Sequence, residues 1–571
     1  MGSHLLLSPI LLGHIPTFGD REPPFLEIAS GLHFAELCTM ATTVKNQDKI
    51  KLNGTDRTDF NGMMEVEYSY LYECLRKNKD TDIYFSDLFA ALHAVGIMEN
   101  DPRLKFDLSD LNLASRRLDY ETFKEILKHS LGGVIKDAVQ GNLIIPDFKS
   151  FCKEINEIYD LTNKNKGGNV ATYIPQLGRV DPDKYAISVC TVSGQQFSIG
   201  DSNEDFCIQS ICKPVNYCMV LEEHGEDIVH QHVGREPSGI GFNGLVLNEN
   251  NLPHNPMINA GAIMTCSMIS PELEMADRFE HVLNFWNKIT GNQNAMGFNN
   301  SVYLSEKETA DRNFALGYYM KEKGAFPENT NLLNTLEFYF QCCSIQTDTN
   351  AMAVAAATLA NSGICPLTNE RVMENNTVKN CLSLMNSCGM YDFSGEFAFT
   401  IGLPAKSGVA GGLMLVIPNL MGIAIWSPKL DKSGNSVKGI EFSKELVKRY
   451  NFHSYDSLNL NNPAKKDPRL KRNEARIDDA MSLCWAASEG DLLEVQHLYA
   501  RGININMADY DGRTALHLAA SEGHEHVIAY LIDKGVDLNP RDRWGNTPLH
   551  DACKGKHNGT ILLLEANNAL K

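Results

Sequence analysis

The chain has 571 residues, which is long enough for more than one domain. Its 71 acidic and 52 basic side chains give a formal net charge of −19, which argues against nucleic acid and anionic membranes as general partners. Fifteen scattered cysteines without metal-binding spacing suit a reducing compartment, and no apolar stretch is long enough to span a bilayer.

Residues 1–57 are weakly patterned and are predicted to be largely disordered. Before Lys45 the segment holds four acidic residues and Arg21 as its single Lys or Arg. Mitochondrial transit peptides are Arg-rich and acid-poor, so this N-terminus matches them poorly. The first four residues resemble an expression tag, and we expect a natural leader to be missing from this sequence.

Residues 58–160 are predicted to form a helical domain. Apolar residues recur there at i, i+3 and i+4 in four stretches, at 63–77, 84–97, 120–139 and 146–161. The segment 99–107 contains Pro102 and lacks the central glycine of a calcium-binding loop. We therefore expect these helices to support the structure and not to bind calcium.

Residues 161–456 begin with a predicted hairpin, in which the strands 185–192 and 195–200 are joined by a turn at Ser193 and Gly194. A helix is expected over residues 211–220, with Ser210 at its N-terminus, where the helix dipole favours a developing negative charge.

Ser210 and Lys213 are three residues apart and share one helix face, so the lysine amine can reach the serine hydroxyl. A serine needs an adjacent base to become nucleophilic, and a buried lysine with a lowered pKa can be that base. On these residues alone the alternative stays open that Ser210 only caps the helix and Lys213 is solvated.

A second motif, Lys406-Ser407-Gly408, precedes two predicted buried strands at 413–417 and 421–426. The pairing of S-x-x-K with a later K-[ST]-G strand is typical of β-lactamases and penicillin-binding enzymes, and it favours a serine hydrolase. The N–H group of Val409, in the glycine-rich turn, is expected to complete an oxyanion hole. The alternative is a core strand with Lys406 at its exposed end.

Residues 457–477 are rich in Lys and Arg and are predicted to be a flexible linker; a basic docking patch is the alternative. The segment 511–520 then recurs as 544–553, with a period of 33 residues and the T-x-L-H signature of ankyrin repeats. His517 and His550 occupy the histidine of that signature and are expected to be structural. We expect residues 478–571 to be a separable module that binds an unknown protein partner.

Six blocks together resemble the serine-dependent, phosphate-activated glutaminases of animals, and the resemblance covers residues 60–460. The blocks are "YIPQL" (173–177), "CIQSICKP" (207–214), "PHNPMINAGAI" (253–263), "SEKETADRNFALGYY" (305–319), "CGMYDFSGEFAF" (388–399) and "GLPAKSGVAGG" (402–412). The resemblance implies a β-lactamase-like catalytic domain, an EF-hand-like helical domain without a calcium loop, and hydrolysis of the side-chain amide of L-glutamine to glutamate and ammonia.

The same resemblance implies roles for individual residues. Ser210 would be the nucleophile and Lys213 its base, while Tyr391 would relay a proton to the leaving ammonia. The N–H groups of Ser210 and Val409 would form the oxyanion hole, and Lys406 is a secondary pocket candidate. The residues expected to hold glutamine are Tyr173, Gln209, Ser210, Asn259, Glu306, Asn313, Tyr339, Tyr391 and Val409.

For assembly, the resemblance implies homodimers that pair into homotetramers or filaments, with inorganic phosphate as an activator and no metal or other cofactor. The contact between dimers would run through residues 241–251, where Phe242, Leu245, Val246 and Leu247 form an apolar cluster. The implied location is mitochondrial; the unsuitable N-terminus leaves a cytoplasmic location as an alternative.

Two other functions share some of these features. A β-lactam or peptidoglycan acyl hydrolase would carry the same two lysine motifs, but it predicts a secretory leader and does not explain the repeats. A catalytically dead ankyrin scaffold predicts substitutions at the Ser–Lys pair or in the pocket, and every implied position is intact.

Overall fold

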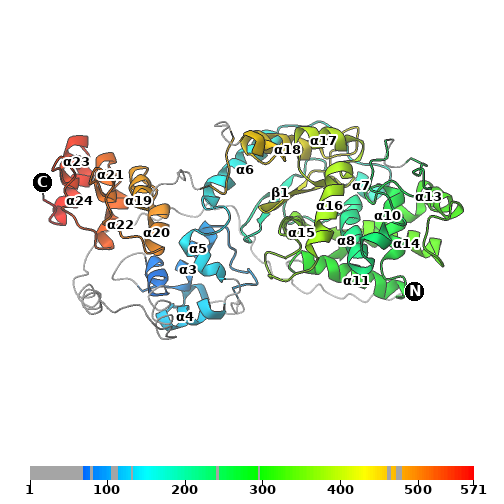
Figure 1. Ribbon diagram of the computed structural model, residues 1–571, viewed down its shortest axis with the longest axis horizontal. Coiled ribbons are helices and arrows are strands. Elements are labelled where there is room, and N and C mark those ends of the chain that lie inside the picture. Colours follow the sequence, from blue (N-terminus) through cyan, green and yellow to red (C-terminus); the bar gives the residue numbers. More distant parts are fainter. Residues whose placement is uncertain are drawn as a thin grey trace, which may run out of the picture.

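The computed structural model describes residues 68–76, 82–104, 113–129, 133–239, 244–292, 296–459, 465–470 and 479–570. Three parts follow one another along the long axis of the molecule in Figure 1. The repeat region lies at one end, the helical domain in the middle, and a large domain built around a sheet at the other end. The predicted disorder of residues 1–57 lies outside the described residues.

The helical domain contains amphipathic helices, as predicted. The stretch 120–139, expected as one helix, forms two, because Gly133 adopts a left-handed conformation (φ 66°) that starts the second helix. Phe85, Leu88, Phe123 and Ile135 are buried in its core. The helices are α3 (Phe85–Ala94), α4 (Tyr120–His129), α5 (Val134–Gln140) and α6 (Phe148–Thr162), with a 3₁₀ turn at Leu113–Ser115.

A five-stranded antiparallel sheet of order β2-β1-β8-β7-β6 forms the centre of the large domain. Both predicted hairpins are confirmed, and their strands pair in register from Ala186 opposite Gly200 and from Gly412 opposite Trp426. The strands are β1 (Ala186–Thr191), β2 (Gln196–Gly200), β6 (Ala405–Ser407), β7 (Gly412–Ile417) and β8 (Met421–Trp426).

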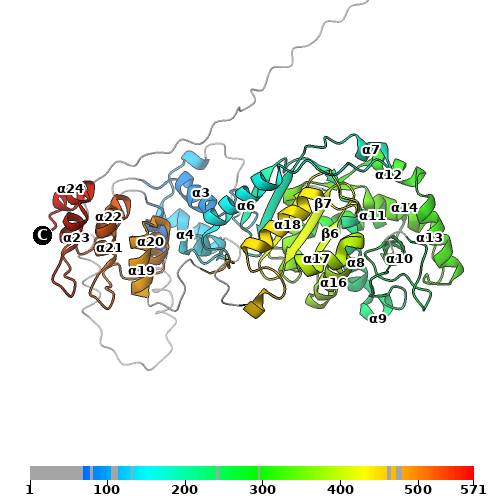
Figure 2. The same ribbon diagram turned by 90° about the horizontal axis from the view of Figure 1, so that it is seen from above.

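Helices cover both faces of this sheet, which explains why β7 and β8 are apolar at nearly every position. On one face, α15 (Thr349–Ala360) packs against β1, β7 and β8. On the other face, α6, α17 (Ser394–Thr400) and α18 (Val437–Arg449) enclose a second apolar core, and Figure 2 shows α17 and α18 over the strands.

A helical layer lies beyond α15 and carries most of the predicted site. A small sheet of order β3-β5-β4 joins it to the chain before Ser210. The helices are α7 (Pro175–Gly178), α8 (Cys212–His224), α9 (Glu226–Val229), α10 (Asn259–Met268), α11 (Met275–Ile289), α12 (Asn300–Glu308), α13 (Asp311–Glu322), α14 (Leu332–Cys343) and α16 (Asn375–Cys388). The small strands are β3 (Phe206–Cys207), β4 (Gly297–Phe298) and β5 (Ile345–Thr347).

The turn between β1 and β2 anchors the helical domain to the large domain. The fully buried Gln195 side chain donates from Nε2 to the carbonyls of Val95 and Ile145 (both 3.0 Å) and accepts from the Ile145 N–H (3.0 Å). Arg103 donates from Nη1 to the Ser193 carbonyl (2.8 Å). Buried hydrogen bonds of this kind fix the orientation of the two domains.

The repeat region consists of paired helices with its own apolar core. His517 holds the start of α21, since its Nδ1 accepts from the Thr514 N–H (3.1 Å), which confirms the structural role predicted for it. The helices are α19 (Asp479–Ser488), α20 (Leu492–Ala500), α21 (Ala515–Glu522), α22 (Glu525–Asp533), α23 (Pro548–Gly555) and α24 (Asn558–Ala566).

The repeat stack, predicted to be a separable module, contacts the helical domain on one face, where α20 packs against α5. Ala500 belongs to the core of the helical domain, and the Tyr70 and Tyr499 rings meet edge to face at 5.9 Å. Lys534 donates to the Glu73 carbonyl (3.3 Å). Repeat signatures describe contacts within the stack, so they could not reveal this contact with a segment some 400 residues earlier.

We expect removal of residues 478–571 to loosen the helical domain while leaving catalytic turnover within about threefold, because the tail packs on α5 and lies at the opposite end of the molecule from α8. The variant is a chain that ends near Pro463. Hydrogen exchange of α3 and α5 measures the loosening, and kcat measures turnover. Tyr510→Ala, at an exposed repeat position, is the control and should change neither. A loss above about tenfold in kcat with the sheet domain folded would mean that the tail supports catalysis directly.

Candidate active site

Ser210 lies in a 3₁₀ turn (Gln209–Ile211) that leads directly into α8. The turn follows β3, so the short sheet and the helix together hold the serine in place. Lys213 lies in the first turn of α8 and is completely buried, as is Lys406 at the centre of β6. The alternatives of a solvated Lys213 and an exposed Lys406 are therefore wrong.

The lysine amine and the serine hydroxyl are in contact. Lys213 Nζ donates to Ser210 Oγ (2.7 Å) and to Asn259 Oδ1 (2.8 Å). Asn259 in turn donates from Nδ2 to Asn313 Oδ1 (3.1 Å), and the Tyr339 hydroxyl donates to Asn259 Oδ1 (3.4 Å). Five residues predicted from widely separated blocks thus form one hydrogen-bonded network, although their roles stay predictions.

The environment favours the neutral form of both lysines. Burial lowers the pKa of Lys213 from its ordinary value. Burial, assisted by the nearby charge of Lys213, lowers the pKa of Lys406 still further. A neutral Lys213 amine has a lone pair that can accept the Ser210 proton, while its remaining hydrogens keep the contact with Asn259.

Lys406 also positions Tyr391. Its Nζ donates to the carbonyls of Gly389 (3.1 Å) and Ser407 (2.8 Å) and lies 4.5 Å from the centre of the Tyr391 ring. Burial raises the pKa of Tyr391, and a hydrogen bond with Ser210 partly offsets this rise. The tyrosine hydroxyl is therefore protonated near neutral pH and lies beside the Ser210 hydroxyl.

Two site residues adopt a backbone conformation that the sequence did not indicate. Gln209 (φ 50°) and Tyr391 (φ 55°) are left-handed, which is uncommon for side chains of this size. Gln209 immediately precedes Ser210, and Tyr391 forms a hydrogen bond with it. Such strain persists only where surrounding contacts impose it, and it is concentrated at functional sites. No turn residue marks either position, so sequence patterns could not find them.

A buried carboxylate forms the opposite side of the site. The Tyr173 hydroxyl donates to Glu306 Oε1 (2.5 Å) and lies 3.5 Å from Gln209 Oε1. Burial raises the pKa of Glu306, while its hydrogen bonds with Tyr173 and Gln209 lower it. Because these partners are neutral, the charge of Glu306 is available to a ligand cation.

The glycine-rich turn that carries Val409 lies against the segment before the serine. Gly408 donates from its N–H to the Gly412 carbonyl (2.9 Å), which closes the turn. A Cβ atom on Gly408 would lie 2.7 Å from the Ile208 carbonyl oxygen, so only glycine permits this approach. The turn that carries Val409 therefore lies against Ile208 and Ile211, on either side of Ser210, and the oxyanion-hole role of Val409 stays a prediction.

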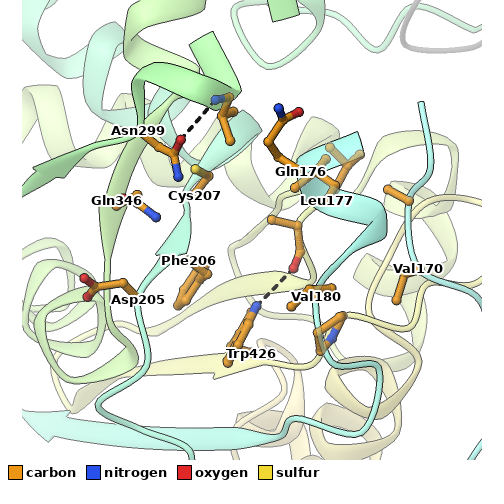
Figure 3. A pocket seen from close by; sticks show the side chains of 15 residues that line it. Val170, Gln176, Leu177, Val180, Asp205, Phe206, Cys207, Asn299, Gln346 and Trp426 are labelled. Carbon is orange, nitrogen blue, oxygen red and sulfur yellow. Dashed lines mark hydrogen bonds between the residues drawn. The ribbon is translucent and has the colours of Figure 1, made fainter. Parts of the chain in front are cut away.

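A small cavity of about 110 Å³ lies behind this turn. Figure 3 shows Gln176 and Leu177 above it, and Phe206 and Trp426 below it. Trp426 donates from Nε1 to the Ala410 carbonyl (3.0 Å) and stacks on Phe206. The turn that carries Val409 is thus supported from behind by an aromatic pair.

The predicted contact loop is exposed in part. Leu245 and Val246 are exposed, while Leu247 is half-buried and packs against the main core; the role of the loop in assembly stays a prediction. Phe242 lies outside the described residues.

Within the described ranges, no group of three or more His, Cys, Asp or Glu residues could hold a metal ion. The helices in those ranges include none with the length and apolarity needed to cross a membrane.

Comparison with known proteins identifies the family. The family model described as "Glutaminase" matches residues 168–455, which contain the whole network around Ser210. The chain belongs to the glutaminase family. Models described as "EF-hand domain" and "Ankyrin repeats (3 copies)" match residues 68–146 and 483–571 of this glutaminase. These findings confirm the predicted fold class and the enzyme class, and the domain boundaries stay predictions.

Individual relatives support the same assignment. A putative glutaminase 3 of Caenorhabditis elegans is 44% identical over 455 residues, covering 78% of this chain and 78% of its own. The mitochondrial liver isoform of glutaminase from Rattus norvegicus is 44% identical over 431 residues, covering 74% and 71%. A solved structure described as a probable glutaminase is 33% identical, has a TM-score of 0.51, and covers 53% of this chain and 97% of its own.

Proposed function

We propose that this enzyme hydrolyses the side-chain amide of L-glutamine to L-glutamate and ammonia through an acyl-enzyme on Ser210. The observation that carries the proposal is the contact of 2.7 Å between the buried Lys213 amine and the Ser210 hydroxyl. A β-lactam or peptidoglycan substrate is not favoured, because the family assignment and the repeat region do not accord with it.

In the first half of the reaction, Lys213 accepts the Ser210 proton and Oγ attacks the amide carbon of the substrate. The N–H groups of Ser210 and Val409 stabilise the oxygen that becomes negative. Lys213 then returns the proton through the Tyr391 hydroxyl to the amide nitrogen, and ammonia leaves. The product of this half is a glutamyl ester of Ser210.

In the second half, water attacks the ester and the same groups act in reverse. Lys213 accepts a proton from the water through Tyr391, the tetrahedral intermediate collapses, and Ser210 regains its proton as glutamate is released. Lys406 acts as a positioning residue. Its amine contacts the Tyr391 ring and donates to the carbonyls of Gly389 and Ser407, the last residue of β6.

Recognition of glutamine follows from the charges of the site. Glu306 pairs with the α-ammonium group of the substrate, assisted by Tyr173. Neutral donors from Gln209, Asn259, Asn313 and tyrosine hydroxyls hold the α-carboxylate and the amide. A ligand that lacks either group leaves buried polar atoms unpaired, which provides specificity.

The pH profile tests the Ser–Lys mechanism. We expect kcat/KM to rise with pH as Lys213 loses its proton, with a midpoint below the ordinary lysine value of 10.5, because burial lowers this pKa. A second decrease in kcat/KM is expected at acid pH as Glu306 is protonated. The pH profile of Glu306→Gln should lack this decrease and keep the one caused by Lys213. A single midpoint near 10.5 would contradict a buried lysine base.

We further propose that inorganic phosphate activates the enzyme through assembly of dimers into tetramers or filaments. The exposed Leu245 and Val246 support this, since exposed apolar residues on a loop are typical of contact surfaces. A mitochondrial location is proposed by analogy with the liver isoform. The repeat stack is proposed to bind a protein partner through its surface away from α5.

Leu245→Asp is expected to shift large assemblies toward dimers, because it places a charge in a dry contact. Light scattering with and without phosphate measures the change. Leu562→Asp, at an exposed position of the repeat stack, is the control and should leave the distribution unaltered. An unchanged mass distribution for the Leu245 variant would remove this loop from the interface.

A further inference from the structure

A second cavity, of about 540 Å³, opens at the far end of three helices that carry the active site. Helix α10 starts at Asn259 in the site and ends at Met268 in the cavity wall, and α14 runs from Thr335 at the cavity to Tyr339 in the site. Helix α8 starts beside Ser210 and ends at His224, which also lines the cavity. At about 1.5 Å per residue, the connecting stretch measures about 14 Å in α10, about 18 Å in α8 and about 6 Å in α14, so rigid helices connect the two places.

The floor and the rim of this cavity differ in charge. Arg278 and Thr335 are buried, so they form the floor. Glu272, Glu274 and Glu328 are exposed and surround the opening. A positive charge therefore lies at the bottom and negative charges lie at the entrance.

Arg278 is 6% exposed and held rigidly. Its Nε donates to the Ile269 carbonyl (2.6 Å), its Nη2 donates to the Cys266 carbonyl, and its guanidinium lies 4.1 Å from the centre of the Phe338 ring. In the part of the chain that the structure describes, no carboxylate forms an ion pair with it. An arginine stays charged near neutral pH, so the floor presents a buried cation whose hydrogen bonds go to neutral carbonyls, while the charges of Glu223 and Glu272 act on it without direct contact.

A helix N-terminus strengthens this positive region. The first turn of α14, a helix of 12 residues, borders the cavity through Asn331, Asn334 and Thr335. The Asn334 N–H donates to Asn331 Oδ1 (3.2 Å) and the Thr335 N–H donates to the Asn331 carbonyl (3.0 Å), so this turn contributes the positive end of the helix dipole. Together with Arg278, that dipole favours a carboxylate at the floor.

The walls between floor and rim are largely apolar. Met268 and Met275 line the cavity, and Leu273 and Ile228 are exposed beside it. Methionine side chains adapt to ligands of different shape. The walls therefore suit an aliphatic or aromatic group.

We propose that this cavity is an effector site for a free amino acid with an apolar side chain. The carboxylate of the ligand pairs with Arg278, its ammonium group faces the rim glutamates, and its side chain contacts the methionines and Leu273. Inorganic phosphate fits less well, because the rim glutamates repel a dianion, whereas a zwitterion meets both charges favourably. The ligand acts on the active site through α8, α10 and α14.

The test is calorimetric titration of the full chain with L-leucine in the presence of saturating glutamate, which occupies the active site. We expect one site per chain. Leucinamide, which lacks the carboxylate, should bind at least about 30-fold more weakly because Arg278 stays unpaired. N-acetyl-leucine, which lacks the ammonium group, should bind about fivefold more weakly, since rim charges contribute less.

Two variants separate this site from the active site. Glu272→Gln combined with Glu274→Gln, both exposed, should weaken leucine binding and abolish the difference between leucine and N-acetyl-leucine. Glu306→Gln, in the active site, should leave leucine binding unchanged. No binding of leucine, unchanged binding by the rim variant, or tighter binding of inorganic phosphate would overturn the proposed ligand.

The effector role has its own readout. Leucine should change the KM for glutamine by about twofold or more in the natural sequence and not in the rim variant, because the connecting helices carry Lys213, Asn259 and Tyr339. Binding without any change in KM would overturn the effector role.

Discussion

Ser210→Ala is expected to lower glutamine turnover by at least about 10⁴-fold while glutamine binding and thermal stability stay nearly unchanged. The substitution removes the oxygen that accepts a hydrogen bond from Lys213 at 2.7 Å, and it leaves the other polar contacts of the network intact. The measurements are ammonia and glutamate release and the thermal shift caused by glutamine, with ampicillin hydrolysis as a check on substrate class.

Lys213→Ala should be comparably inactive, and the double variant should be no worse than either single one, because nucleophile and base act as a unit. Cys212→Ala is the matched control: it lies between the two residues, is equally buried and contacts Cys343 through its sulfur. We expect this control to keep turnover within about threefold. Robust turnover by either Ser210→Ala or Lys213→Ala would end the assignment of this pair.

Glu306→Gln is expected to lower kcat/KM by roughly 30-fold to several thousand-fold, equivalent to about 2 to 5 kcal/mol, because a desolvated ammonium group loses its counter-charge. Most of the change should appear in KM, since the carboxylate contacts the α-ammonium group and not the reacting amide. Glutamine kinetics and calorimetric binding of glutamate to the same variant provide the measurement.

Glu308→Gln offers the control for this change. It lies at the end of the same helix, α12, and is exposed, so it removes an equal charge without touching the site. We expect its kcat/KM to stay within about twofold. Equal effects of the two substitutions would mean that Glu306 acts only through the general charge of the protein.

Local patterns were sufficient for several elements. The alternation of apolar residues around Ser193 and Gly194 predicted the β1–β2 hairpin, and the spacing of Ser210 and Lys213 predicted their contact. Both features depend on residues within about fifteen positions, where backbone geometry alone determines which side chains meet.

Local patterns failed where the outcome depended on distant segments. The burial of Lys406 results from α16, Tyr391 and the strand β7 closing around it, and its sequence neighbourhood is compatible with an exposed strand end. The left-handed Gln209 and Tyr391 likewise have no local signal, because the surrounding packing imposes their conformation.

The sequence by itself determined the family, the Ser–Lys pair, the repeat period and the apolar runs of the main strands, because each is written in a short stretch of sequence. Only the tertiary structure decided that Lys213 and Lys406 are buried, that Leu247 packs against the core, that α20 docks on α5, and that Arg278 is buried below exposed glutamates. These properties depend on solvent exclusion and on the approach of residues far apart in the chain, and both arise only when the layers of the fold pack together.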